Sequence, residues 1–306
     1  MDTAKNKVQV LMSTYNGEKY LREQLDSILQ QDHKNITLLI RDDGSSDSTL
    51  SILEEYSSKY SNVEYYQGDN IGAKNSFFDL IQKTDQTADF YSFSDQDDVW
   101  KSNKLSNAII QMSNYNKYRK IPLLYCSGFD VVDENLNAHM IKTNLSNIKP
   151  DFGNSIIENI CVGCTMVINN KLLLLVRKKI PRQAFMHDWW LYMVATCFGK
   201  VIYDKHSYIL YRQHKNNVVG APEGSGHKFI RRILKYQTKK GIVLKQALEF
   251  IEIYEVDKNK SELLNYVINY KKILRFRLKI IYSNQIFRQD KKDNIIFKLM
   301  FLFGQV

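Results

Sequence analysis

The stretch Phe90-Tyr-Ser-Phe-Ser-Asp-Gln-Asp-Asp-Val-Trp100 decides how the chain folds. Its first five residues are apolar or small, which is typical of a buried strand. Three carboxylates follow directly, at Asp95, Asp97 and Asp98. Carboxylates this close together repel one another unless a cation or protons compensate their charge. A solvated acidic turn is the alternative, but apolar residues anchor the cluster on both sides. Because oxygen ligands favour Mg²⁺ or Mn²⁺, the stretch predicts a metal site at a strand end.

Before this stretch, short apolar runs alternate with helical patterns. Strands are expected at 8–12, 36–40, 63–66 and 90–94, and helices after each of the first three. Such alternation predicts a mainly parallel sheet with crossover helices, the α/β class. Ligands of these sheets bind beyond the carboxyl ends of the strands. We therefore expect the polar loops 13–17, 41–47 and 95–98 to converge on one site.

After Trp100 the pattern becomes mixed. It predicts helices at 105–112 and 188–198 and strands at 123–126, 164–168, 201–203 and 208–211. Beyond about residue 226 it predicts helices rich in Lys and Arg, such as 271–282. The predicted organisation is an α/β domain over residues 1–225 and a basic helical region over 226–306.

The charge of the chain is concentrated at its C-terminal end. With 44% hydrophobic and 25% charged residues, the 306-residue chain is typical of globular proteins, and its net charge is +10. Residues 228–306 contain 18 Lys and Arg against 7 Asp and Glu, whereas the rest contains 25 against 26. A basic helix with an aliphatic stripe at 271–282 suits an anionic membrane surface. Packing of that stripe on the first domain is the alternative, and no nucleic-acid-binding module is recognised.

The small number of cysteines and the lack of a signal-peptide pattern predict an intracellular protein. Four cysteines do not suggest a disulfide framework in a chain of this length. Cys161-Val-Gly-Cys164 has the spacing of half a zinc knuckle, but no matching second pair occurs, so two buried residues on a strand are expected. We find no signal peptide and no run long enough to span a membrane. The expected location is the cytoplasm, peripheral to the inner face of the plasma membrane.

Six motifs together resemble the family 2 glycosyltransferases, whose fold is called GT-A. The likeness is greatest to bacterial rhamnosyltransferases that build cell-wall or capsular polysaccharides. The motifs occur in the expected order over roughly the first 220 residues, and as an ordered set they are specific. They are Ser13-Thr-Tyr-Asn-Gly17, Arg41-Asp-Asp-Gly-Ser45, Asn70-Ile-Gly72, Ser94-Asp-Gln-Asp-Asp-Val-Trp100, His187-Asp-Trp189 and Tyr211-Arg-Gln-His214.

The resemblance implies a role for each matched residue. Asp43 would accept a hydrogen bond from a pyrimidine ring, and Asp95 would contact the nucleoside. The residues implied in nucleotide-sugar binding are Thr14, Tyr15, Asn16, Asp43, Asp95 and Gln96. Asp97 and His214 would bind the divalent metal ion, Mg²⁺ or Mn²⁺. The match is poorer at Gly163-Cys-Thr165, where many members have a Gly-rich acceptor loop.

Asp188 occupies the position of the family's catalytic base. Transfer to a hydroxyl needs a base for its proton and a cation for the departing diphosphate. Flanked by His187 and two tryptophans, Asp188 suits a partly desolvated carboxylate, although it also suits a helix N-cap. Trp189 and Trp190 are candidates for stacking on the acceptor sugar. For His187 an ordinary structural role is expected.

The predicted function is inverting, metal-dependent transfer of a sugar from a nucleotide donor to a lipid-linked polysaccharide. The resemblance favours L-rhamnose from dTDP-rhamnose, and a UDP-hexose donor is the alternative. A non-catalytic carbohydrate-binding protein is the alternative from another class. A nucleotidyltransferase is disfavoured, because the loop 13–17 contains no Lys or Arg for a triphosphate.

Overall fold

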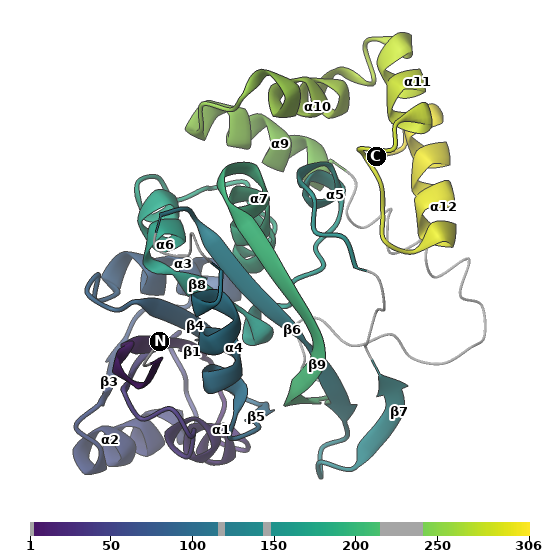
Figure 1. The fold of residues 1–306 in the computed structure, drawn as a ribbon. Helices are drawn as coiled ribbons and strands as arrows, with labels where there is room; N and C mark the ends of the chain where they lie inside the picture. The colour runs from purple at the N-terminus through teal and green to yellow at the C-terminus, as the bar shows by residue number, and fades with distance from the viewer. Residues whose placement is uncertain (1–2, 116–119, 143–147, 215–240) are drawn as a thin grey trace.

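The computed structural model describes residues 3–115, 120–142, 148–214 and 241–306. Within them one sheet runs in the order β3-β2-β1-β4-β8-β6-β9-β5, and β7 pairs with β6 (Figure 1). The strands are β1 (Val8–Thr14), β2 (Ile36–Asp42), β3 (Val63–Gln67), β4 (Phe90–Ser94), β5 (Val99–Trp100), β6 (Leu123–Val132), β7 (Ala138–Lys142), β8 (Val167–Asn169) and β9 (Lys200–Arg212).

Helices flank this sheet and continue beyond it. The N-terminal part contains α1 (Leu21–Leu29), α2 (Thr49–Lys59), α3 (Gly72–Lys83), α4 (Lys104–Ser113), α5 (Phe152–Ile157), α6 (Asn170–Arg177) and α7 (His187–Phe198). The C-terminal part contains α9 (Ile242–Ile253), α10 (Lys258–Asn269), α11 (Leu274–Tyr282) and α12 (Lys291–Leu302). Short 3₁₀ turns, η1 (Thr3–Lys5) and η2 (Gly163–Thr165), complete the described elements.

The first four strands have the parallel arrangement that the alternating pattern predicts. β1 lies between β2 and β4, and β2 continues to β3, all in parallel register. β8 is antiparallel to both β4 and β6, so the sheet is mixed. The predicted α/β fold class is therefore confirmed. Parallel pairing brings the carboxyl ends of β1, β2 and β4 to one edge of the sheet.

Three predicted elements differ from the structure. The strands expected at 201–203 and 208–211 are one long strand, β9, whose pairing with β6 shifts register around Gly128. The strand expected at 164–168 begins only at Val167, because η2 precedes it. The helix expected at 271–282 begins at Leu274, after a turn that contains Lys271 and Lys272. No Gly or Pro marks this last turn, so the pattern alone did not show where the helix begins.

The C-terminal helices share a core with the sheet domain. Trp190 of α7 packs on Phe250 and Tyr254, with ring centroids 5.3 and 6.1 Å apart. One buried apolar cluster extends from Leu11 of β1 through α7 to Phe301 of α12. The expected boundary near residue 225 lies outside the described residues, so the division into two domains stays a prediction. No described helix is both long and apolar enough to cross a bilayer.

Candidate active site

The loops that follow β1, β2 and β4 are tied together by hydrogen bonds. The backbone N–H of Tyr15 donates to Oε1 of Gln96 at 2.8 Å, and Nε2 of Gln96 donates to the Tyr15 carbonyl at 3.0 Å. The backbone N–H of Asn16 donates to the hydroxyl of Ser45 at 2.9 Å. The predicted convergence of the three polar loops is thus confirmed. Gln96 joins two of these loops, and its contact with a nucleotide sugar stays a prediction.

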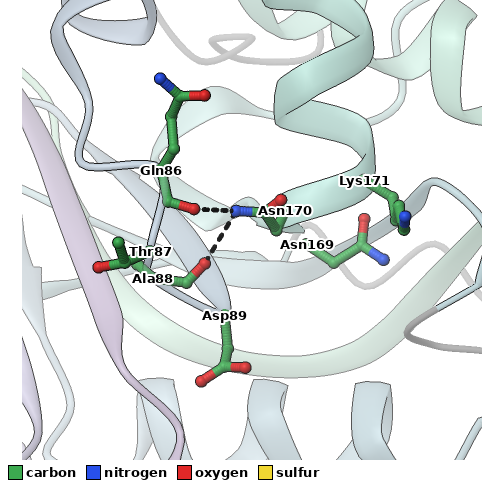
Figure 2. Close-up of a pocket in the computed structure, with 7 residues that line it drawn as sticks. All are labelled: Gln86, Thr87, Ala88, Asp89, Asn169, Asn170 and Lys171. Carbon is green, nitrogen blue, oxygen red and sulfur yellow. Dashed lines mark hydrogen bonds between the residues drawn. The ribbon is translucent and has the colours of Figure 1, made fainter.

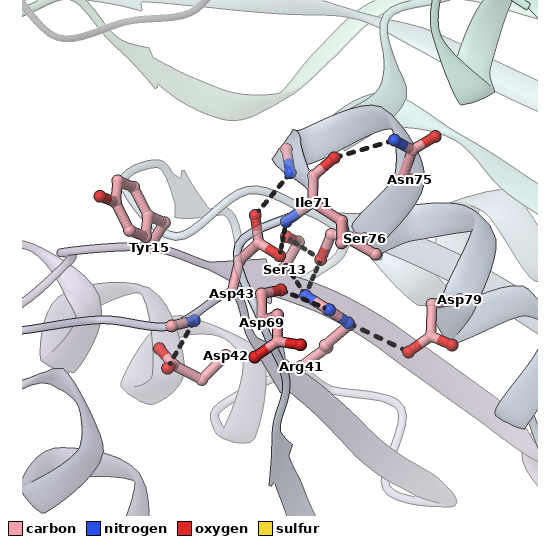
Figure 3. A network of polar contacts seen from close by, with 12 residues as sticks. Ser13, Tyr15, Arg41, Asp42, Asp43, Asp69, Ile71, Asn75, Ser76 and Asp79 are labelled. Atoms are coloured by element: carbon pink, nitrogen blue, oxygen red, sulfur yellow. Dashed lines mark hydrogen bonds and ion pairs between the residues drawn. The ribbon is translucent and has the colours of Figure 1, made fainter.

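A buried arginine organises the loop after β2 (Figure 3). Arg41, 3% exposed, donates to Asp43 and, at 3.0 Å, to Asp79. The carboxylate of Asp43 also accepts the N–H groups of Ile71 and Gly72 at 3.0 and 2.9 Å. Asp43 is itself only 2% exposed. Contact between Asp43 and a pyrimidine ring stays a prediction, and it requires the buried carboxylate to become accessible.

The residues after β1 differ in what they offer to a ligand. Thr14 is 1% exposed, and its hydroxyl donates to Asp42 at 3.1 Å. Its carbonyl accepts the N–H of Asp43 at 2.8 Å, so the residue is buried and bonded within the protein, and its nucleotide contact stays a prediction. Tyr15 is 48% exposed, which leaves its ring accessible to a planar ligand. Asn16 has φ 47°, and its Oδ1 accepts from the N–H of Ser46 at 2.9 Å.

Strand pairing brings Asp97 and His214 together. The short strand β5 pairs antiparallel with β9, so Val99 lies opposite Leu210. Asp97 lies two positions before β5 and His214 lies two positions after β9, so both are at the same end of the antiparallel pair. Nε2 of His214 lies 2.7 Å from Oδ2 of Asp97. Their side chains are 11% and 15% exposed. The structure therefore places the two predicted metal-binding residues side by side, although they are 117 positions apart.

Arg212 fixes this arrangement, and sequence reasoning did not assign it a role. Its backbone N–H donates to Oδ1 of Asp98 at 3.2 Å, and its Nε donates to the carbonyl of Asp97 at 2.9 Å. The guanidinium lies 4.4 Å from the ring centroid of Tyr20, and that ring packs on His214. The only sequence signal was its place within Tyr211-Arg-Gln-His214.

The acidic cluster has the electrostatics expected of a cation site. Burial, then the charges of Asp97 and Asp188, raise the pKa of Asp95 to about 7. Burial, followed by Asp97 and Asp95, raises the pKa of Asp98 well above its ordinary range. A positive ion beside these groups would lower both values by favouring the charged carboxylates. The site is therefore stabilised by a cation or, without one, by protons.

One group of three possible metal-ligating side chains among the described residues does not include the predicted metal pair. Ligand atoms of Asp95, Asp98 and Cys164 lie within 4.8 Å of one another. Burial raises the pKa of the Cys164 thiol well above its usual range, and a protonated thiol is a poor ligand for Mg²⁺ or Mn²⁺. Cys164 lies in η2 rather than on the expected strand. The carboxylate oxygens of Asp97, with His214 beside them, fit such an ion better.

Asp188 lies at the start of α7, where it accepts two backbone N–H groups. Its Oδ1 accepts from Trp189 at 2.6 Å, and its Oδ2 accepts from Gly163 at 3.2 Å. The charge of Asp188 also acts on Asp95, so the expected base lies close to the acidic cluster. The glycine at 163 is a residue whose role the sequence analysis missed, although it noted the weak motif there. A Cβ at Gly163 would lie 2.9 Å from Nε2 of His187.

His187 is buried beside Asp188 without a hydrogen-bond partner for either ring nitrogen among the described residues. Its ring stacks on Phe77 at a centroid distance of 4.0 Å and lies 5.3 Å from Phe93. Burial lowers the pKa of His187 to about 3, so the ring is neutral at physiological pH. It therefore packs as an aromatic core residue, while its polar atoms add a desolvation cost.

The prediction that two tryptophans stack on an acceptor sugar is wrong in this structure. Trp189 is 4% exposed and donates through Nε1 to the carbonyl of Ser155 at 2.6 Å. Trp190 is fully buried against Phe250. α7 is apolar on nearly all sides and lies between other elements, which is the position expected for such a helix. Both tryptophans are core residues.

A cavity of about 290 Å³ lies away from this site (Figure 2). Asn170 donates to the carbonyls of Gln86 and Ala88 at 2.6 and 3.1 Å on its wall. The lining residues precede β4 or lie where β8 ends and α6 begins, whereas Asp95 follows β4. The five residues of β4 span roughly 16 Å, so the cavity is at the opposite edge of the sheet and is not part of the acidic site.

Comparison with known proteins decides the family. The model of glycosyl transferase family 2 matches residues 9–174, more than half of the chain. The chain belongs to glycosyl transferase family 2. The matched range contains the three converging loops and the acidic cluster, whereas Asp188 and His214 lie beyond it. Membership makes the chain a glycosyltransferase and confirms the resemblance seen in its motifs.

Two glycosyltransferases of known name are among the proteins similar to the chain. The chain is 35% identical to the dTDP-rhamnosyl transferase RfbG of Shigella flexneri over 224 residues, 69% of this chain and 74% of that protein. It is 29% identical over 170 residues to WfgD of Escherichia coli, a UDP-Glc:alpha-D-GlcNAc-diphosphoundecaprenol beta-1,3-glucosyltransferase. That match covers 55% of this chain and 61% of WfgD.

Solved structures of glycosyltransferases have the same fold. S. aureus TarS in complex with UDP-GlcNAc superimposes with a TM-score of 0.58 at 17% identity, over 96% of this chain and 79% of that one. The mannosyltransferase PcManGT from Pyrobaculum calidifontis, in complex with GDP-Man and Mn²⁺, gives 0.50 at 13% identity, over 98% and 76%. The predicted GT-A fold is confirmed by this likeness.

Proposed function

We propose that this glycosyltransferase is an inverting, metal-dependent enzyme that transfers L-rhamnose from dTDP-rhamnose to a growing, lipid-linked surface polysaccharide of bacteria. The observation that supports the proposal best is the contact between Asp97 and His214, since it assembles the expected diphosphate site from distant parts of the chain. Asp188 lies near the same acidic cluster, where a catalytic base is required.

The residues divide into a donor side and an acceptor side. On the donor side, the accessible ring of Tyr15 contacts the nucleoside, with Thr14 and Asn16 beside it, and Asp97 and His214 would hold the metal ion. Mg²⁺ or Mn²⁺, when bound, offsets the negative charge of the leaving diphosphate. Asp95 contacts the nucleoside from the neighbouring loop.

On the acceptor side, Asp188 takes the proton from the attacking hydroxyl. The N–H groups of Gly163 and Trp189 orient its carboxylate. One displacement then forms the new glycosidic bond as the sugar–phosphate bond breaks. The proton passes to Asp188 and the electron pair of the broken bond leaves with the nucleotide diphosphate. A base and a leaving group on opposite faces of the ring give inversion at the anomeric carbon.

The donor sugar is proposed from the relatives. The likeness to RfbG favours dTDP-rhamnose, and it extends over two thirds of the chain. A UDP-hexose is the second candidate, because the name of WfgD gives UDP-Glc as its donor. It ranks second because the match to WfgD is shorter than the match to RfbG. The acceptor of WfgD is a diphosphoundecaprenol-linked sugar, which supports a lipid-linked acceptor and a peripheral position on an anionic membrane surface.

The test is a panel of nucleotide sugars, with dTDP-rhamnose first, assayed for nucleotide release with Mg²⁺, with Mn²⁺ and after chelation. We expect turnover of dTDP-rhamnose that needs the ion and is lost in Asp97→Ala. Turnover of UDP-glucose or UDP-galactose without dTDP-rhamnose would replace the donor assignment and leave the enzyme class intact. Full turnover after chelation would contradict the metal-dependent mechanism.

A further inference from the structure

Large apolar side chains are exposed on the last two helices. Six of the eleven exposed large hydrophobic residues in the described ranges belong to α11, to α12 and to the residue directly after α12. Their exposed fractions are high for such side chains: Leu274 63%, Leu278 43%, Tyr282 81%, Ile295 62%, Leu299 49% and Phe303 69%. Single exposed hydrophobic residues are normal, but a cluster of six indicates an interaction surface.

The spacing places these side chains in two rows. In each helix the three residues are four positions apart, which keeps them on one side of the helix. We call Leu274, Leu278 and Tyr282, together with Ile295, Leu299 and Phe303, the exposed rows. Each helix buries a different side: Phe276 and Ile280 in α11, and Phe297 and Phe301 in α12. Folding thus uses the inner apolar sides and leaves the exposed rows uncovered.

The two helices form one surface region. Nη1 of Arg277 in α11 donates to the carbonyl of Leu302 at 3.2 Å, and Nζ of Lys298 in α12 donates to the carbonyl of Ser283 at 2.9 Å. Both helices lie at the periphery of the molecule, away from β1, β2 and β3 (Figure 1). Both exposed rows are therefore open to solvent in one region of the molecule.

The charges around the exposed rows are almost all positive. Residues 270–306 contain nine Lys and Arg and only two Asp or Glu. The exposed Lys271 precedes Leu274 by three positions in the turn before α11, and the exposed Lys291 precedes Ile295 by four within α12. Each row thus has a basic residue close to its start in the sequence. Arg275 is exposed next to the row of α11. This combination complements a surface that is negatively charged outside and apolar beneath.

We propose that α11 and α12 lie on an anionic lipid bilayer, with the exposed rows inserted at the boundary between headgroups and acyl chains. Helices that bind in this way combine an apolar side with flanking Lys and Arg. A second copy of the chain fits less well, because two such positive surfaces would repel each other. The inference rests on the membrane contact in the proposed function and names the surface that makes it.

The experiment is sedimentation of the full chain with lipid vesicles. Phosphatidylcholine vesicles with phosphatidylglycerol are compared with phosphatidylcholine alone. The test variant is Leu278→Gln with Leu299→Gln, one substitution in each exposed row. The matched control is Leu248→Gln with Ile251→Gln on α9, where the side chains are 42% and 39% exposed. Size-exclusion chromatography of each variant reports folding and oligomeric state.

We expect the wild type to bind anionic vesicles, to bind neutral vesicles weakly and to dissociate at high salt. The row variant should bind at least about tenfold more weakly, because two apolar side chains no longer enter the bilayer, and the control should bind like the wild type. Equal binding by the row variant, equal loss in the control, or a dimer that the row variant abolishes would overturn the inference. Turnover of the donor without vesicles is measured separately. A lack of turnover would count against the proposed function, whereas the vesicle results test the membrane surface alone.

Discussion

Replacement of Asp188 by Asn separates its proposed chemistry from its structural contacts. The carboxylate accepts the N–H of Trp189 at 2.6 Å through Oδ1 and that of Gly163 at 3.2 Å through Oδ2. An asparagine keeps one acceptor oxygen and places an NH₂ group where the second was. It also loses the negative charge at the start of α7 and cannot take up a proton at neutral pH.

The magnitudes of the two effects differ greatly. Loss of one hydrogen bond to a backbone N–H costs about 1 kcal/mol, and loss of a charge at a helix N-terminus costs about 0.3–1 kcal/mol. We therefore expect the free energy of unfolding of Asp188→Asn to fall by about 1–2 kcal/mol. General-base catalysis contributes about 10²–10⁴-fold, so kcat for transfer should fall by that factor.

The chain contains a matched control at Asp257. This residue is the N-cap of α10, and its Oδ1 accepts the N–H groups of Asn259 and Lys260, both at 3.1 Å. Asp257→Asn removes a similar carboxylate far along the chain from the acidic cluster. Urea unfolding of both variants should show similar losses of stability. Nucleotide release with donor and acceptor should then be impaired only in Asp188→Asn.

The reasoning is refuted by one clear outcome. If Asp188→Asn transfers sugar at a rate within a few-fold of the Asp257→Asn control, then Asp188 is only a helix-capping residue. Donor affinity provides a further check, because the proposed base acts on the acceptor. Binding of the nucleotide diphosphate should therefore be nearly unchanged in Asp188→Asn.

Three further substitutions test neighbouring features. Burial holds the pKa of His187 near 3, so as the pH falls below 6.5 the unfolded chain takes up a proton that the folded chain excludes. This difference makes the folded protein less stable in acid by up to about 1.4 kcal/mol per pH unit, and His187→Phe should remove that contribution. Urea unfolding between pH 6 and 4 measures it. Equal slopes in both proteins would argue against a buried neutral ring. Gly163→Ala places a Cβ 2.9 Å from His187 and should lower kcat about tenfold by shifting Asp188, whereas unchanged kinetics would contradict that orienting role. Gly153→Ala brings a Cβ within 2.0 Å of the Gln285 carbonyl and should cost more than about 2 kcal/mol; a melting temperature equal to that of the wild type would count against this close packing.

The hydrophobic pattern of the sequence predicted the strand before the acidic cluster and the convergence of the three polar loops. The strand expected at 90–94 is β4 with the same bounds, and the three polar loops converge as the parallel sheet requires. The family resemblance named Asp97 and His214 together, and the pairing of β5 with β9 explains their contact.

What the sequence did not show depends on contacts between distant segments. The continuity of β9 follows from its long pairing with β6. The burial of Trp189 and Trp190 depends on α5 and α9, which no local pattern relates to α7. The amide of Gly163 meets Asp188 only after both segments have folded. These features could not be predicted from local patterns, because each joins residues with no periodic relation in the chain.

The central claim is tested most directly by the position of a manganese ion. Crystals grown with Mn²⁺ and dTDP would show the ion by its anomalous scattering. We predict one ion in contact with the Asp97 carboxylate and an oxygen of the diphosphate, beside His214, and no ion there in Asp97→Ala crystals. An ion and a nucleotide bound away from the loop 95–98, or neither bound at saturating concentrations, would contradict the proposed mechanism.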